Sequence, residues 1–245
     1  MKLLCLDIGN TSITICDYKN EKLGEITRVA SNENFINQLT NYNIDNFDFI
    51  ILCSVVPSLT KILINYCKNH SINIYEINYK NSHLNLHVDN PSEVGNDRIC
   101  NAIAAKKLNF NPSIIIDFGT ATTYDVINVD GDFIGGAIAP GIDVSADYLI
   151  NKTALLKDTI YKFPPKVIGK NTVSNIQAGV MYGGLASVEG MIKLIDAEIG
   201  DVSNNIIITG GFGKLISEKI NIKHTYIESL TIEGMLQVFF KNKRN

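Results

Sequence analysis

Two short segments of the sequence combine residue types that suit phosphate binding. In each, an aspartate ends an apolar run and is followed by glycine and hydroxyl-bearing residues: DIGNTS begins at Asp7, and DFGTATT begins at Asp117. Glycine lets backbone N–H groups approach a ligand, N–H and hydroxyl groups bind phosphate oxygens, and a carboxylate can hold magnesium through water. Together they indicate a clamp for a nucleoside triphosphate, although one such segment alone is also typical of a plain hairpin turn.

A third glycine-rich segment, ITGGFG at residues 208–213, lies between a predicted strand and a predicted helix. Glycines in this position let the backbone approach a nucleoside closely. Taken alone, the segment fits an ordinary strand-to-helix turn equally well. The nucleoside-binding interpretation is favoured only because the two aspartate-containing segments occur in the same chain.

The elements that must position these segments repeat along the chain. Residues 2–20 predict two strands joined by a tight turn, and residues 113–140 predict the same pair followed by a third strand. Residues 47–67 predict a buried strand through Cys53 and then a helix, and the apolar spacing after residue 95 predicts a second helix ending near 109–112. Further helices are expected at 142–149, at 172–199 and after the strand at 205–209.

This mixture of strands and helices predicts an α/β protein, and the repeated hairpin indicates two related halves. We expect a boundary near Pro112, which gives domains at residues 1–112 and 113–245. A chain of 245 residues is long enough to bury a large core without disulfides.

Composition and charge exclude several classes of protein. With 22 Lys and Arg against 25 Asp and Glu, the net charge is -3, which argues against a nucleic-acid partner. No apolar run approaches the length of a membrane span, and Asp7 interrupts the opening apolar residues before they could form a secretory signal. Five scattered cysteines and four scattered histidines predict neither disulfides nor a metal centre, so we expect a cytoplasmic protein with reduced thiols. The basic tail KNKR, residues 241–244, is expected to be frayed and solvated.

The segment VDNPSEVGNDRICNAIAA, residues 88–105, makes the likeness to one family specific. Its Asn-Pro, its Gly-x-Asp-Arg and its alanine-rich helix resemble the pantothenate-binding signature of type III pantothenate kinases, in the acetate and sugar kinase/Hsp70/actin superfamily. The order of all motifs from Asp7 to Gly213 is similar too, including GGAIAPGI at 135–142 and GKNTVSNIQAGVMYGG at 169–184. The resemblance implies two actin-like (ribonuclease H-like) half-domains, each a mixed β-sheet flanked by helices, with the nucleotide cleft between them.

The resemblance also implies roles for individual residues. Asp97 would be the general base that accepts the hydroxyl proton of pantothenate as that oxygen attacks the γ-phosphorus of ATP, a usual task for a carboxylate. The substrate-binding residues would be Gly95, Asn96, Asp97, Arg98 and Thr172, with Thr172 reaching the site from the partner subunit of a homodimer. The ATP-binding residues would be Asp7, Ile8, Gly9, Asn10, Thr11, Ser12, Ile13, Thr14 and Thr120.

The cofactors implied are ATP, Mg²⁺ or another divalent cation, and K⁺ or NH₄⁺ held by Asp117. One position departs from the family: where many members have a tyrosine two residues before the Asn-Pro, this chain has Val88, preceded by His87. The resemblance therefore supplies no substrate contact at this position.

Other interpretations of these residues remain open from sequence alone. Asp97 could simply be a first-turn residue of a capped helix, and Thr172 could be the N-cap of the long helix, with Ser174 as a competitor. The same fold could phosphorylate another acceptor, such as a sugar, an acid or polyphosphate. It could also serve as a nucleotide-dependent scaffold or as an accessory factor for transcription. The presence of both Asp7 and Asp97 favours catalysis over these non-catalytic roles.

Overall fold

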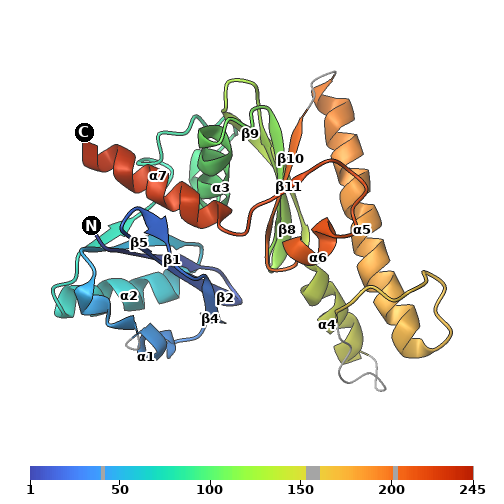
Figure 1. Ribbon diagram of the computed structural model, residues 1–245, viewed down its shortest axis with the longest axis horizontal. Coiled ribbons are helices and arrows are strands. Elements are labelled where there is room, and N and C mark those ends of the chain that lie inside the picture. Colours follow the sequence, from blue (N-terminus) through green and yellow to red (C-terminus); the bar gives the residue numbers. More distant parts are fainter. Residues whose placement is uncertain (40–41, 153–160, 201–203, 245) are drawn as a thin grey trace. The chain divides into compact units, whose positions relative to one another are not determined.

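The computed structural model describes residues 1–39, 42–152, 161–200 and 204–244 (Figure 1). The chain forms two compact units. Unit 1 comprises Met1–Phe110, Gly131–Ile134 and Ser229–Asn245, and unit 2 comprises Asn111–Asp130 and Gly135–Glu228.

The sheet of unit 1 is mixed. Along its main path the strand order is β3-β2-β1-β5-β6, and β4 also pairs with β2. The central strand β1 is antiparallel to β2 and parallel to β5, which in turn is parallel to β6. The strand bounds are β1 Leu3–Ile8, β2 Ser12–Lys19, β3 Lys22–Leu23, β4 Thr27–Ala30, β5 Phe49–Ser54 and β6 Ile74–Glu76.

Helices cover both faces of this sheet because both faces of β1 and β5 are apolar. On one face, Leu4, Leu6 and Ile8 pack in a core with α1 and α2. On the other face, Leu3 and Cys5 pack with α3 and α7, which lie against each other (Figure 1). The helix bounds are α1 Phe35–Leu39, α2 Pro57–Asn69, α3 Asn96–Lys107 and α7 Leu230–Arg244, with short 3-10 helices η2 at Ile44–Asn46 and η3 at Pro91–Glu93.

Unit 2 repeats the same strand plan. Its sheet has the order β11-β10-β7-β8-β9, in which β7 is antiparallel to β8 and parallel to β10. Helices α5 and α6 cover the face that carries Ile114, Ile116 and Phe118. The element bounds are β7 Ser113–Phe118, β8 Ala121–Ile127, β9 Phe133–Pro140, α4 Ile142–Lys152, α5 Thr172–Ile199, β10 Asn205–Gly210, α6 Gly213–Ser217 and β11 Thr225–Tyr226.

The repeated hairpin predicted from the sequence is confirmed, as is an α/β fold built from two mixed sheets. In each unit a central strand has its hairpin partner on one side and a parallel strand on the other. The sequence did not reveal the short elements β3, β4, β6, β11 and α1, because segments of two to five residues carry too little periodicity to identify.

Two expectations about the chain end differ from the structure. Residues 241–244 are not frayed but form the last turn of α7, where the Lys243 ammonium lies 4.1 Å from the ring centroid of Phe49. The compact units also differ from a single cut after residue 112, because α7 packs on α3, β1 and β5 and so returns the chain end to unit 1.

The contact between α3 and α7 generates a first prediction. A Cβ atom on Gly234 would overlap the backbone of Cys100 and lie only 2.8 Å from its Cα, so Gly234→Ala must push the two helices apart. We expect this change to destabilise the protein by about 1–3 kcal/mol, measured as a lower thermal midpoint. Gly190→Ala is the control, because nothing lies within 4 Å of the added atom in α5, and better helix propensity should stabilise by up to about 1 kcal/mol. Equal midpoints for the two variants would contradict this view of the interface.

Candidate active site

The first predicted phosphate segment is the turn between β1 and β2. Gly9 N–H donates to the Ser12 carbonyl at 3.0 Å, and a Cβ on Gly9 would lie 3.1 Å from that oxygen, so the turn is tight. Ser31 Oγ donates to the Gly9 carbonyl at 2.6 Å and fixes the turn from outside. Asn10 and Thr11 at its tip are exposed, whereas Ile8 and Ile13 are fully buried in the core. Only the backbone of these two isoleucines is available to a ligand.

Asp7 lies at the carboxyl end of β1, directly opposite Cys53 in the parallel strand β5. Side chains alternate along a strand, so Asp7 shares the face of Leu3 and Cys5, the face that α3 covers. The hydrogen bond that Cys53 shares with Cys100 and its complete burial raise the pKa of the Cys53 thiol. The nearby carboxylates of Asp7 and Asp97 raise that pKa further, so both aspartates lie near one buried thiol.

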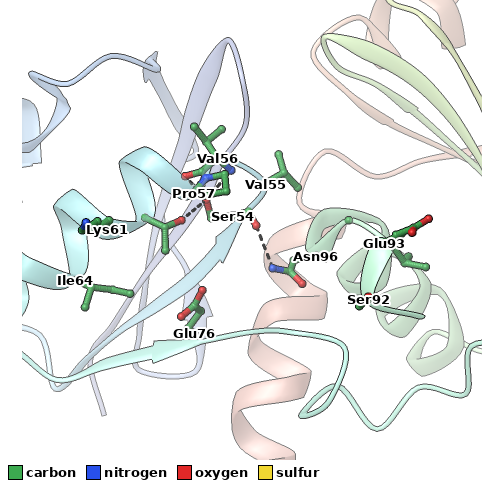
Figure 2. A pocket seen from close by; sticks show the side chains of 13 residues that line it. Ser54, Val55, Val56, Pro57, Lys61, Ile64, Glu76, Ser92, Glu93 and Asn96 are labelled. Carbon is green, nitrogen blue, oxygen red and sulfur yellow. Dashed lines mark hydrogen bonds between the residues drawn. The ribbon is translucent and has the colours of Figure 1, made fainter. Parts of the chain in front are cut away.

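The Gly95–Arg98 segment starts α3 beside the ends of the same strands. Gly95 is the N-cap and Asn96 begins the helix. Asn96 Nδ2 donates to the Ser54 carbonyl at 3.0 Å (Figure 2), which ties the helix start to the last residue of β5. The preceding Asn-Pro is ordered by its own bonds, since the Asn90 side chain accepts from Ser92 N–H at 3.2 Å and caps η3.

Asp97 sits in the first turn of α3, as the structural interpretation of this motif expected. Its Oδ1 accepts from the Arg98 N–H at 2.8 Å. Burial raises the pKa of the Asp97 carboxyl above its ordinary value, while that hydrogen bond and the positive charge of Arg98 lower it. A partly buried carboxylate with a raised pKa is suited to accept a proton, so the helix-start and general-base interpretations are compatible.

A cavity of about 500 Å³ opens beside this helix start. Figure 2 shows its lining, which comes from the β5–α2 turn and α2 itself, from Glu76 at the end of β6, and from the segment that leads into α3. Gly95 and Asn96 line it, whereas Asp97 and the β1–β2 turn do not. Ser54 Oγ, which accepts from Thr60 Oγ1 at 2.7 Å and from Val56 N–H at 3.1 Å, holds the turn at its base.

In unit 2 the second segment forms the turn between β7 and β8. Gly119 N–H donates to the Ala121 carbonyl at 3.1 Å, a turn one residue shorter than its counterpart in unit 1. Thr120 is at its tip, and its carbonyl accepts from Gly141 N–H at 3.0 Å. Asp117 pairs with Thr209 of β10 and occupies the face opposite Ile116 and α5.

The geometry at Gly210 explains why β10 ends in glycine. Its φ is +87°, and a Cβ there would collide with the Asp117 carboxylate and lie 2.5 Å from the Phe118 nitrogen. In the third predicted segment, glycine thus lets the backbone lie close to the Asp117 carboxylate. Unit 2 places Asp117, Thr120 and Gly210 around one end of its sheet.

Thr172 is the first residue of α5, and the N-cap is Asn171 rather than Thr172. Asn171 Oδ1 accepts from Ser174 N–H at 2.9 Å, and Ser174 Oγ accepts from Asn171 N–H at 3.2 Å, which together form a capping box. The alternative that Thr172 caps the helix is therefore wrong. Its side chain is exposed.

Three residues that contact the Gly95–Arg98 region or its neighbours carry no signal in the sequence. Cys53 and Ser54 are the last residues of an apolar strand. Phe133, whose ring centroid lies 5.3 Å from Arg98 Cζ, has the sequence pattern of an ordinary core residue. No local motif marks any of them.

Within the described ranges, no group of three or more His, Cys, Asp or Glu side chains could hold a metal ion, and no helix is long and apolar enough to cross a membrane.

The environment of Asp97 yields a second prediction. In a ¹³C titration of the carboxyl groups, Asp97 should titrate above the ordinary aspartate pKa of about 3.9, because burial disfavours the charged form. In Arg98→Gln the pKa should rise further, since the neighbouring charge that lowers it is removed. A lower pKa in Arg98→Gln would refute this account.

Comparison with known proteins shows which family this sequence matches. The family model for type III pantothenate kinase matches residues 3–194. A type III pantothenate kinase of Moorella thermoacetica is 37% identical, over 98% of this chain and 99% of that protein.

Solved structures share the fold at lower identity. A Campylobacter jejuni protein, provisionally described as a Baf family transcriptional activator, has a TM-score of 0.65 and 20% identity over 99% of this chain and 100% of its own. MreB5 of Spiroplasma citri bound to ADP has a TM-score of 0.57 and 13% identity over 100% and 98% of the two chains. These likenesses establish the actin-like ATPase fold, and the two sequence matches, each covering most of the chain, establish that it belongs to the type III pantothenate kinase family.

Proposed function

We propose that this protein is an ATP-dependent pantothenate kinase, which converts pantothenate to 4′-phosphopantothenate in the first step of coenzyme A biosynthesis. Membership of the type III family supports the substrate and the reaction. The observation that carries the mechanism is that Asp7, at the carboxyl end of β1, and Asp97, in the first turn of α3, both lie near Cys53 of the parallel strand β5, at the kind of strand end where α/β folds place their ligands.

Asp97 acts as the general base in this proposal. Its carboxylate accepts the proton of the primary hydroxyl of pantothenate as that oxygen forms a bond to the γ-phosphorus of ATP. The bond from the γ-phosphorus to the bridging oxygen breaks, and ADP leaves with that electron pair. Gly95, Asn96 and Arg98 hold the substrate, and Arg98 supplies positive charge beside an anionic carboxylate or phosphate.

The β1–β2 turn binds the ATP phosphates. Asp7, Gly9, Asn10, Thr11, Ser12 and Thr14 offer backbone or side-chain groups, whereas Ile8 and Ile13 offer backbone groups alone because their side chains are buried. Thr120, in the corresponding turn of unit 2, contacts the nucleotide. Tight turns of this kind present N–H groups to phosphate oxygens without a large side-chain entropy cost.

Two cations fit the residues present. Asp7 can hold Mg²⁺ through water, and the ion would neutralise charge on the transferring phosphoryl group. Asp117 suits K⁺ or NH₄⁺, because the Gly210 backbone approaches its carboxylate so closely that a Cβ would fill the space. When bound, this monovalent ion offsets the negative charge of the phosphates.

The working form in this proposal is a cytoplasmic homodimer. Unit 2 exposes several large apolar side chains, as expected of a surface that binds another protein: Ile138, Tyr148, Ile168 and Val173 are 66%, 67%, 83% and 49% exposed. Thr172 is exposed next to Val173, and in this proposal it acts in the site of a second copy. Five buried free cysteines suit the reducing cytoplasm, and a net charge of -3 argues against nucleic acid as a partner.

The central experiment measures ADP release with ATP, Mg²⁺ and pantothenate, with and without K⁺. Asp97→Asn should lower kcat by about 10²–10⁴-fold, the usual contribution of a general base, while the thermal midpoint stays close to that of the wild type. Asp45→Asn is the matched control, since it removes an exposed carboxylate from the first turn of η2. A full turnover rate in Asp97→Asn would exclude Asp97 as the base, and ADP release that favours another hydroxyl compound would exclude pantothenate as the acceptor.

Subunit mixing tests the role of Thr172. Thr172→Ala should raise the KM for pantothenate about tenfold, the value of one lost hydrogen bond. If Thr172 acts in its partner's site, a mixed dimer of Thr172→Ala and Asp97→Asn subunits contains one intact site. An equal mixture should then recover about one quarter of wild-type activity at low pantothenate, because half of the dimers are mixed. Activity at the mean of the two parent variants, after verified exchange, would place Thr172 outside the partner's site.

A further inference from the structure

We propose that Phe133 is a positioning residue for the substrate-binding Arg98, and that Asp132 anchors it in place. Asp132 ends the connection between β8 and β9, and Phe133 is the first residue of β9. Both are outside every motif discussed above and lie with unit 1. The inference rests on the proposed function, because it assigns Phe133 a task in binding pantothenate.

Backbone hydrogen bonds hold Phe133 on both sides. Its N–H donates to the Asn85 carbonyl at 3.0 Å, and its carbonyl accepts from the His87 N–H at 2.9 Å. Leu86 between them forms a parallel bridge with Phe133. The residue is 1% exposed, so its ring has a fixed place.

The ring of Phe133 supports the guanidinium of Arg98. Arg98 Cζ lies 5.3 Å from the ring centroid, within the range of a cation–π interaction. The backbone of Arg98 is set by the first turn of α3, but the long side chain could adopt many rotamers. An aromatic face selects rotamers that keep the charge at the start of α3, where Arg98 holds the substrate in the proposed function.

Asp132 fixes the same segment through a buried carboxylate with three partners. Its Oδ1 accepts from Asn85 Nδ2 at 3.0 Å and lies 3.5 Å from Lys106 Nζ, and its Oδ2 lies 3.1 Å from His87 Nε2. The hydrogen bond with His87 is the main cause that lowers the pKa of Asp132, so the ionised form is favoured. Residues 132–133 thus contact the first turn of α3 through Arg98 and its last turn through Lys106.

This arrangement ties two parts of the substrate region together. Asn85–His87 precede Val88 and the Asn90-Pro91 pair, whereas Arg98 follows it. Residues 132–133 contact both Asn85–His87 and Arg98, so they set the distance between these two parts of the substrate region. They act on Arg98 and on the backbone before Val88, not on the Asp97 carboxylate. Loss of the ring should therefore weaken substrate binding and leave the chemical step nearly intact.

The test compares Phe133→Leu and Phe133→Met, two apolar replacements without a ring, in the full-length enzyme. Each should raise the KM for pantothenate by about 2-fold to 30-fold, the span of cation–π strengths, with kcat within about 2-fold of wild type. In an Arg98→Gln background, the same replacements should not raise KM further. An unchanged KM, or an equal rise in the Arg98→Gln background, would overturn the proposal.

A second readout does not depend on the substrate. In ¹H–¹⁵N spectra the Arg98 Nε–H signal, assigned by its absence in Arg98→Gln, should be shifted upfield by the ring current of Phe133. That shift should vanish in both ring-less variants, with thermal midpoints showing that they fold. If the wild type lacked the shift, the geometry would be wrong. If the shift behaved as expected but wild-type protein released no ADP with pantothenate, the proposed function would fail while the contact stood.

Discussion

The parallel pairing of β1 with β5 is the constraint on which the site of unit 1 depends. It sets Asp7 opposite Cys53 and places Ile8 opposite Ser54, so that the ends of two buried strands form one edge. Asn96 then fixes the start of α3 to that edge through the Ser54 carbonyl. A one-residue slip in this register would turn Asp7 toward the apolar core beneath α2 and separate it from Asp97.

The packing that supports this register is unusually close where α3 meets α7. Gly234 lets the two helix backbones touch at Cys100, and Cys100 in turn shares a hydrogen bond with Cys53, the thiol near the two aspartates. The hydrogen bond with Cys100 and complete burial raise the pKa of the Cys53 thiol, so it stays protonated, behaves as a small apolar residue and adds no charge beside Asp7 and Asp97. The chain end therefore helps to hold α3, although it lies far from the motifs in sequence.

The two aspartate-containing turns are alike in backbone plan but differ in what surrounds them. In unit 1 the turn is backed by buried isoleucines and fixed by Ser31, whereas in unit 2 Gly210 and Gly141 approach the turn directly. The first turn thus leaves exposed polar residues at its tip, and the second surrounds a carboxylate with backbone. Such a difference suits a phosphate ligand in one case and a weakly held cation in the other.

The sequence by itself determined the α/β class, both hairpins and most helices, because strand alternation, helical spacing and turn residues are local signals that neighbouring residues carry together. It also indicated the family, through the resemblance of residues 88–105 and the order of the motifs. It could not assign the cap of α5 to Asn171, since Asn171, Thr172 and Ser174, three of four consecutive residues, have similar cap chemistry. Only the tertiary structure decided that Asp7 and Asp97 share one buried thiol, that α7 returns to unit 1, and that Phe133 lies under Arg98. Those contacts join residues tens to hundreds of positions apart, and a long-range contact leaves no periodic trace in the segments that form it.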